Sequence, residues 1–458
     1  MPVSYILYFI LVLLGVRWNG FFIYVLFALI SVGVLTKKKY DLSTKLFIIG
    51  IFSIIVPDNY IPELLFILFF VINILENGIK EKKTRYACIF ILFILNAVFS
   101  VLVNMVPLPN IIFSIISFLP FIAFLCLLDR NCKTVKFDYT EHIDKVLFIE
   151  FISVPMNFIF YYSTHGEDWS KGTFGMSEGE QAQLFVIAAF LTVYYLYGFI
   201  SNQHNKKTFV KTILSFVIAL STNCWTLLAA LAAGIILSYV LALNKKKMLI
   251  AILILALFPI GYNVVLKVLP DRIVFIVNRI ISDDEYFNYR FHKAVVYKET
   301  FVEIPGKDIK FALIGAGAGN YNSRAALICT GEYVGFYESI FSPSISKYTM
   351  EYIYDYVKLA HDNGGSDYGS VLARPYSSIL ALMGECGYIG FGLFIILMIM
   401  QFRKKQTTVN GLLIIWISFC FVENYFEYSK VLLVLCVCIF SAGQLNLSEK
   451  VRRKKEYD

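Results

Sequence analysis

The feature that most constrains this chain is a succession of long apolar runs separated by short polar connectors. A membrane-spanning helix needs about 20 apolar residues, and fewer suffice where neighbouring helices shield one another. Only 16% of the 458 residues are charged and 58% are hydrophobic, whereas a soluble domain has nearer a quarter of its residues charged. The pattern therefore predicts an all-α polytopic membrane protein.

The apolar runs divide into about 14 expected transmembrane helices. They lie near residues 3–16, 21–36, 45–57, 62–77, 86–104, 110–128, 146–162, 183–200, 209–221, 224–243, 248–268, 376–400, 410–422 and 431–445. The N-terminal Met1-Pro2-Val3-Ser4 lacks the basic flank and the cleavage site of a removable signal peptide. We therefore expect the first run to be a retained span.

Clusters of basic residues follow the even-numbered spans. They are Lys37–Lys39, Lys80–Arg85, Arg130–Lys145, Lys206–Lys211, Lys245–Lys247, Arg403–Lys405 and Arg452–Lys455. By the positive-inside tendency that side is the cytoplasm, so both termini are expected there. The net charge of +8 is spread over these short clusters rather than one continuous face, so we do not expect a nucleic-acid partner.

A long polar interval from Asp271 to Arg374 follows the eleventh span and is therefore expected on the outer face. It divides the chain into an N-terminal membrane bundle (1–268), a large extracytoplasmic loop with short helices (269–375), and C-terminal membrane helices with a basic cytoplasmic tail (376–458). No ATP is available outside. A reaction there must use a substrate that arrives already activated.

A glycine run, Gly315-Ala316-Gly317-Ala318-Gly319, lies within this loop and is followed by Asn320-Tyr321. A phosphate-cradling loop needs Gly-Lys-Ser/Thr after it, or a strand-to-helix context with a distal acidic residue, and neither is present. Two interpretations stay open. The run is either a tight bend where backbones approach closely, or a nest of backbone amides near an anionic ligand.

The segment around Arg290 has the spacing of an amphipathic helix, with the recurring residues Phe287, Phe291, Ala294, Val295, Lys298 and Phe301. Such a helix can lie on the membrane surface with its arginines at headgroup depth. Arg290 then either contacts lipid headgroups or is a guanidinium held for a lipid-linked phosphate, which its forked donors suit. Arg279 and Arg324 are further arginines of the same loop.

The twelfth span opens with Arg374-Pro375-Tyr376-Ser377-Ser378. Proline at the first helical position favours a helix start, so we expect free amides and the positive dipole end to face outward beside Arg374. Further along this span, Glu385 is a carboxyl at membrane depth, which is costly and needs a partner or a pathway. It is predicted to be either a structural or a functional carboxyl.

No metal site is expected. Most of the nine cysteines lie inside apolar spans, and no pair has metal-ligand spacing in a loop. The loop histidines, His292 and His361, are either surface residues or general bases beside an acceptor hydroxyl.

Two segments together resemble a known family. Arg290, then Ile304-Pro305, then Leu313 to Tyr321 is similar to the Arg…Pro…Gly-x-Gly-x-Gly-Asn pattern of the O-antigen polymerase and ligase superfamily. Tyr376 to Phe391, with its Glu-x-Gly-x-Ile-Gly, resembles a membrane-helix segment of that family. The number of spans, the single large outer loop, and Ser221-Thr222-Asn223 near a short span fit the same layout.

The resemblance implies a GT-C-like membrane glycosyltransferase of the bacterial cytoplasmic (inner) membrane. Its donor would be an oligosaccharide on undecaprenyl diphosphate, and it would need neither metal nor nucleotide. We expect catalytic roles for Arg290, Arg374, His361, Glu385 and Tyr376. We expect substrate binding by Arg279, Gly315, Gly317, Gly319, Asn320, Arg324 and Ser377. Membrane lipid, a chain-length regulator and a flippase are further candidate partners.

The chain departs from the ligases of the family at one position. They carry a His-Asn pair where this chain has Tyr376-Ser377. This departure favours the repeat-unit polymerase and leaves His361, Asp362 and Glu351 as candidates for the general base. A ligase that transfers finished glycan, and a flippase or transporter for the lipid-linked unit, are the alternatives. A flippase has charged residues lining a central cavity between helical halves, whereas here the charges gather in one outer loop.

Overall fold

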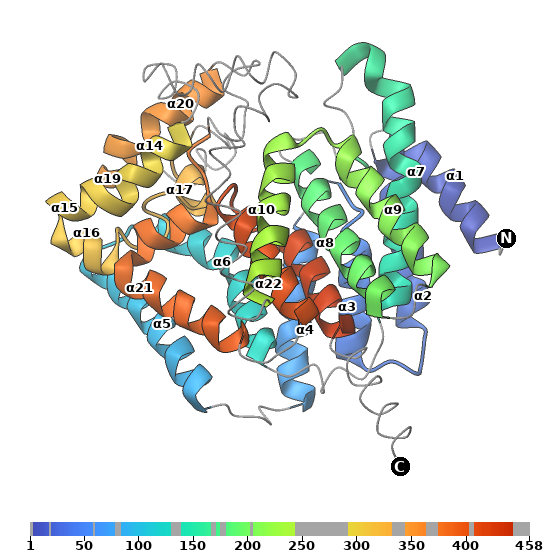
Figure 1. Ribbon diagram of the computed structural model, residues 1–458, viewed down its shortest axis with the longest axis horizontal. Helices are drawn as coiled ribbons and strands as arrows, with labels where there is room; N and C mark the ends of the chain where they lie inside the picture. Colours follow the sequence, from blue (N-terminus) through green and yellow to red (C-terminus); the bar gives the residue numbers. More distant parts are fainter. Residues whose placement is uncertain are drawn as a thin grey trace.

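The computed structural model describes residues 3–17, 20–57, 60–77, 84–129, 139–165, 171–174, 180–201, 205–242, 292–331, 344–362, 374–402 and 407–442. Within these ranges every regular element is a helix (Figure 1). The first ten are α1 (Val3–Arg17), α2 (Phe21–Leu35), α3 (Leu42–Ser53), α4 (Ile61–Asn77), α5 (Thr84–Val103), α6 (Leu108–Asp129), α7 (Thr140–His165), α8 (Glu180–Ser201), α9 (Lys206–Ser221) and α10 (Trp225–Ala242). The all-α class is thus confirmed for the described part of the chain.

The helices of the C-terminal part are α21 (Ser378–Phe402), α22 (Thr407–Cys420) and a last helix, Ser429–Ala442. Helices lie at every expected span except 248–268, which falls outside the described residues. Four segments are long and apolar enough to cross a membrane: Arg85–Val103, Leu108–Leu128, Glu180–Ile200 and Ser378–Phe402. Several shorter apolar helices accompany them. The protein therefore has the character of a membrane-embedded bundle, and the count of 14 spans stays a prediction.

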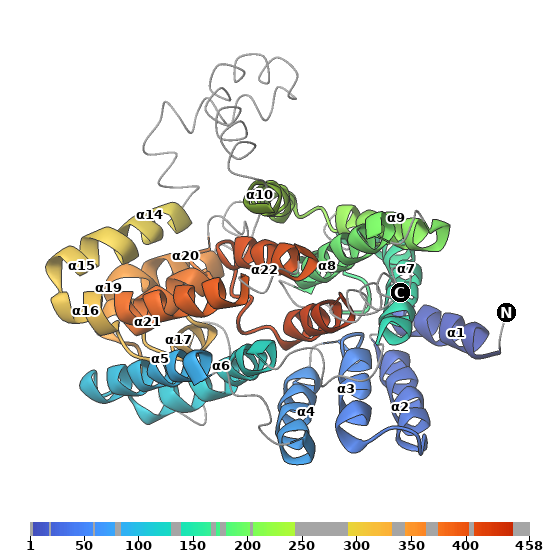
Figure 2. The same cartoon turned by 60° about the horizontal axis from the view of Figure 1, so that its bottom comes forward.

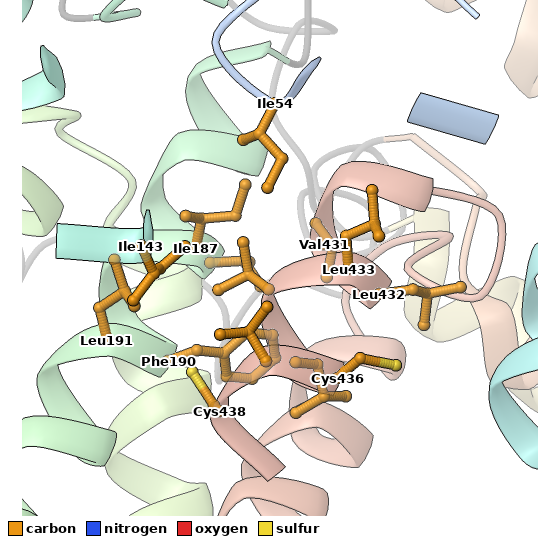
Figure 3. Packing of buried hydrophobic residues seen from close by; sticks show 14 of the residues in the cluster. Ile54, Ile143, Ile187, Phe190, Leu191, Val431, Leu432, Leu433, Cys436 and Cys438 are labelled. Atoms are coloured by element: carbon orange, nitrogen blue, oxygen red, sulfur yellow. The ribbon is translucent and has the colours of Figure 1, made fainter. Parts of the chain in front are cut away.

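The last helix lies in the centre of the main core. Every residue from Ser429 to Ala442 is buried, as expected of a helix that is apolar on all sides. Its side chains pack with Ile187, Phe190 and Leu191 of α8 and with Ile143 of α7 (Figure 3). The C-terminal helices are therefore packed together with the N-terminal ones in a single core.

The connectors that follow odd-numbered spans meet one another. Lys430, after the last connector, donates to the carbonyl oxygen of Val56 at 3.0 Å, between α3 and α4. Its ammonium also lies 3.5 Å from the carboxylate of Glu180 at the start of α8, and Gln181 donates to the carbonyl of Thr222, between α9 and α10. These connectors therefore share one end of the bundle.

The expected outer loop contains a small helical body. Its helices are α14 (His292–Lys298), the π-helix η2 (Glu299–Glu303), α15 (Ile304–Lys307), α16 (Ile309–Ile314), α17 (Arg324–Ile328), α19 (Lys347–Tyr352) and α20 (Tyr354–Asp362). They gather beside α5 and α21 (Figure 2), and α16 packs against both. A second core cluster, which includes Val296, Phe311 and Tyr321, fills the body.

The predicted amphipathic helix around Arg290 is present from His292 onward, but its buried face differs from the prediction. Ala294 and Lys298 are exposed, while Val296, Thr300 and Ile304 are buried. The face with Val296, Thr300 and Ile304 can be buried because its polar side chain, Thr300, forms a hydrogen bond there. The Thr300 hydroxyl bonds to the Tyr321 hydroxyl at 2.7 Å, which removes the cost of burying either group.

Candidate functional site

The glycine run interlocks with the middle of α21. The amide of Ala316 donates to the carbonyl of Gly384 at 2.7 Å, and that of Gly317 to the carbonyl of Glu385 at 3.1 Å. Opposite them, α21 is interrupted at Gly387, whose φ is 66°. The two segments that resemble the glycosyltransferase family, distant in the sequence, are therefore joined backbone to backbone.

The Glu385 side chain completes this interlock. Its carboxylate accepts hydrogen bonds from the amides of Gly319 at 2.8 Å, Ser323 at 3.2 Å and Tyr321 at 3.4 Å. The side chain is only 2% exposed, and a buried carboxylate is stable only when donors surround it. This bonding fits the structural one of the two roles that the sequence left open for Glu385.

The glycines are required by close backbone approach. Gly315, Gly317 and Gly319 have φ values of 74°, 90° and 75°, a region that favours glycine. A Cβ on Gly315 would lie 2.4 Å from the carbonyl carbon of Glu385. The amide nest is also present, but the anion it holds is Glu385 of the chain itself. An external anion would have to displace that carboxylate.

Asparagines of the α5–α6 connection hold the other side of the run. Asn104 donates to the carbonyl of Gly315 at 3.0 Å. Asn110 donates to the carbonyl of Gly319 at 2.7 Å and to the Asn320 side-chain oxygen at 2.9 Å. Asn320, a predicted substrate ligand, is 5% exposed and is part of this internal network.

Arg324 lies at the start of α17 between connectors of the bundle. Its backbone amide donates to both carboxylate oxygens of Glu427 at 3.0 Å. Its guanidinium lies over the rings of Tyr428 and Tyr60, 5.6 and 5.9 Å from their centroids. Arg324 therefore ties the helical body to the connectors on either side of the core.

The start of α21 is closed by side chains rather than left open. The helix begins at Ser378, and Ser377 caps it by accepting from the amide of Leu380 at 3.1 Å. The amide of Ser378 donates to the carbonyl of Glu423 at 3.2 Å. The expectation that the first amides of this helix are free was therefore wrong for Ser378 and Leu380, because a neighbouring connector and a serine cap satisfy them.

Two cationic side chains lie close to this start. Lys293 of α14 is 4% exposed, and its ammonium donates to the carbonyl of Val422. Burial lowers the pKa of Lys293 to about 8, the attraction of Glu423 raises it, and the charge of Arg374 lowers it further. One hydrogen bond uses one of three ammonium donors, so two remain.

Tyr297 connects the same elements. Its hydroxyl lies 2.7 Å from the Ser377 hydroxyl and donates to the carbonyl of Phe421 at 2.9 Å. We call Lys293, Tyr297, Arg374, Ser377 and Glu423 the cation cluster. It brings together α14, the start of α21 and the connector after α22.

Glu423 is the acidic member of the cation cluster. Its side chain is half-buried. Burial raises the pKa of its carboxyl, and the nearby charges of Lys293 and Arg374 lower it. Lys293 and Arg374 are the basic members of the cluster and Glu423 is its acidic member, and basic side chains of these kinds suit an anionic ligand.

The structure thus separates the predicted site residues into groups. Arg374 and Ser377 belong to the cation cluster. The interlock contains Gly315, Gly317, Gly319, Asn320, Glu385 and, at its edge, Arg324. Tyr376 is buried in the second core cluster. Arg279 and Arg290 lie outside the described residues, as does the side chain of His361, whose backbone belongs to α20.

Sequence reasoning missed Lys293, Glu423 and Glu427 as members of these networks. A signal was present for the carboxylates, since Glu423-Asn424-Tyr425-Phe426-Glu427 places two of them between short apolar runs, where charges need partners. Lys293 carried no such signal. Its burial depends on the face that α14 turns toward α21.

Comparison of the chain with protein-family models, curated proteins and solved structures finds no match. Among the residues described here, no group of three or more His, Cys, Asp or Glu side chains is arranged to hold a metal ion. The features that bear on function are therefore the geometry of the cation cluster and the two sequence segments that resemble the glycosyltransferase family.

Gly315→Ala is expected to destabilise the fold. Alanine at a left-handed φ costs about 1–3 kcal/mol, and its methyl group would overlap the Glu385 backbone. The thermal aggregation temperature of the detergent-solubilised protein measures this effect. The matched control is Gly306→Ala on α15, where a Cβ meets nothing within 4 Å. Equal thermal aggregation temperatures for the two variants would contradict the explanation that Gly315 is required by the close approach of the Glu385 backbone.

Glu385→Gln is expected to lower the free energy of unfolding by about 1–3 kcal/mol. The glutamine NH₂ group replaces one acceptor oxygen, so backbone amides that donate to Glu385 would face a donor and lose their acceptor. The same thermal measurement checks it, together with limited proteolysis of residues 313–323. If Glu385 had a purely catalytic role, the thermal aggregation temperature of the variant would be unchanged.

Proposed function

We propose that this chain is a membrane glycosyltransferase that joins oligosaccharide repeat units carried on undecaprenyl diphosphate at the outer face of a bacterial cytoplasmic membrane. The observation that carries the proposal is the cation cluster. Two basic side chains, Lys293 and Arg374, lie near enough to the carboxyl of Glu423 at the start of α21 for their charges to lower its pKa. Arg290, two residues before α14 in the sequence, is a third basic group of the same segment.

The chemistry needs such a cluster. A hydroxyl of the acceptor sugar attacks the anomeric carbon of the donor, the bond from that carbon to the diphosphate oxygen breaks, and the electron pair leaves with the lipid diphosphate. Negative charge therefore accumulates on the diphosphate in the transition state, and fixed positive groups stabilise it. Lys293 has unused ammonium donors, and Arg374 adds a permanently charged guanidinium.

The interlock gives this cluster a rigid base. Glu385 and the glycine run bind residues 315–323 to α21, and Tyr297 bonds α14 to the cap of the same helix. Lys293 and Arg374 come from segments distant in the sequence. Their relative position depends on these contacts, as electrostatic catalysis requires of preorganised groups.

The proposed location on the outer face has its own support. The helical body that carries Lys293 contacts the connectors after the third and fifth expected spans, through Arg324 over Tyr60 and Asn104 on Gly315. Those connectors lack basic clusters, whereas the connectors after even-numbered spans contain them. By the positive-inside tendency, the connectors without basic clusters are expected on the outer face. The absence of the ligase His-Asn pair at Tyr376-Ser377 favours polymerisation over transfer to a final acceptor.

Lys293→Met, Arg290→Ala and Arg374→Ala are each expected to abolish polymer formation while leaving expression intact. Losing one charged hydrogen bond to a diphosphate costs about 1.5–3 kcal/mol, a fall of roughly 10- to 150-fold in donor affinity. The measurement is complementation of a deletion strain, with the surface glycan run on a gel. Methionine keeps the buried volume of Lys293.

The matched control is Lys298→Met on the same helix, where the side chain is 70% exposed and pairs with Glu303. A wild-type ladder from the Lys293 and Arg374 variants would reject the assignment. In the deletion strain itself, a single-repeat product indicates a polymerase. Unattached lipid-linked polymer indicates a ligase, and precursor trapped inside indicates a flippase.

Donor affinity is expected to fall as the pH rises through about 8. Lys293 binds an anion when protonated, and its pKa of about 8 in the folded protein means that the charge is lost above that pH. A phosphate monoester loses its last proton near pH 6, so the ligand charge is constant over this range. The measurement is the affinity of the purified chain for a short polyprenyl diphosphate as a function of pH. In Lys293→Arg this affinity should change little between about pH 7 and 9, because arginine stays charged.

A further inference from the structure

We infer that Glu423 is the general base that takes the proton from the acceptor sugar hydroxyl. The inference rests on the proposed function and adds to it the residue that the sequence left unassigned among His361, Asp362 and Glu351. It is drawn from the bonding of the buried and half-buried carboxylates at this end of the bundle.

Three buried glutamates near the outer connectors accept hydrogen bonds from fixed donors. Glu385 accepts from three backbone amides. Glu427 accepts from the amide of Arg324 with both oxygens, and Glu150 accepts from Thr173 and Ser153. Hydrogen bonds from fixed donors stabilise the ionised form of a carboxylate and occupy lone pairs that a substrate hydroxyl would need.

Glu423 is bonded differently. The hydrogen bond that the structure gives its carboxylate comes from the amide of its own neighbour, Asn424, at 3.3 Å. A carboxylate has about four lone-pair sites, so acceptor capacity remains for a substrate hydroxyl. The side chain is half-buried, which leaves it accessible to a ligand in the cation cluster.

The backbone of Glu423 is nevertheless held firmly. Its carbonyl oxygen accepts from both the amide and the hydroxyl of Ser378 at 3.2 Å. The next residue, Asn424, donates to the carbonyl of Asn322 at 3.3 Å. The carboxylate is thus carried by an anchored connector directly at the start of α21, as a positioned base requires.

The groups around Glu423 come from several elements. Lys293 of α14 and Arg374 before α21 attract its charge, and Tyr425 and Tyr428 follow it on its own connector. The charges of Lys293 and Arg374 favour the ionised carboxylate of Glu423. When a diphosphate binds those cations, the effect of burial dominates and the proton affinity of Glu423 rises. The base therefore strengthens once the donor is bound.

The acceptor oxygen forms a bond to the anomeric carbon as the bond from that carbon to the diphosphate oxygen breaks. The hydroxyl proton passes to a carboxylate oxygen of Glu423, which becomes a neutral carboxylic acid and later releases the proton to water. Lys293 keeps its own proton beside the diphosphate, because the bound anion favours the charged ammonium.

The test uses the purified full-length chain with a polyprenyl-diphosphate-linked oligosaccharide and two kinds of acceptor. One is a second repeat unit, whose hydroxyl must lose a proton. The other is azide, which attacks the anomeric carbon without losing one and gives a glycosyl azide. For Glu423→Gln we expect sugar transfer to fall by about 10²–10⁴-fold, while azide transfer persists near the wild-type rate and donor affinity is unchanged or higher.

Glu303→Gln is the control, since this glutamate of η2 pairs with the exposed Lys298 of α14 at 2.9 Å. Near-wild-type sugar transfer by Glu423→Gln would overturn the assignment. An equal loss of sugar and azide transfer would do so too, because it would indicate a structural role. A loss in Glu351→Gln with none in Glu423→Gln would move the base to α19. If the wild-type chain transfers to neither acceptor, it is the proposed function that fails.

Discussion

The arrangement at the connector end of this protein depends on one carboxylate, that of Glu385. It is buried at 2% exposure and held by the amides of Gly319, Tyr321 and Ser323. An unsolvated carboxylate is stable only in such a shell of donors, and those amides would lack acceptors without it. Each side therefore requires the other, and the contact joins the helical body of residues 292–362 to α21.

That contact also decides what the glycine run can do. An amide nest usually suggests a site for an external anion, but here Glu385 occupies it. The positive φ angles and the 2.4 Å approach at Gly315 are then the requirements of a tight joint between backbones. The proposed function assigns the chemistry to the neighbouring cation cluster, where Lys293, Arg374 and Glu423 lie at the start of the same helix.

Carboxylates at this end of the bundle differ in their surroundings rather than in their type. Glu385 and Glu427 accept from backbone amides of the segment 319–324, whereas Glu423 accepts from the amide of its own neighbour and is near the charges of Lys293 and Arg374. Environment decides whether an acidic residue is structural or reactive. The same holds for the cations, since Arg324 is engaged over two tyrosine rings and Lys293 retains free donors.

The sequence by itself determined the all-α class and the positions of the apolar helices, because length and hydropathy are local properties of each segment. It also marked the glycine run, Arg374 and Glu385 as unusual. It did not determine their partners. Whether Glu385 is structural, which face α14 buries, and whether the start of α21 is free or capped by Ser377 all depend on contacts between residues distant in the chain. Only the tertiary structure decides these, since burial and hydrogen-bond saturation arise when α14, α21 and the connector at Glu423 are brought together.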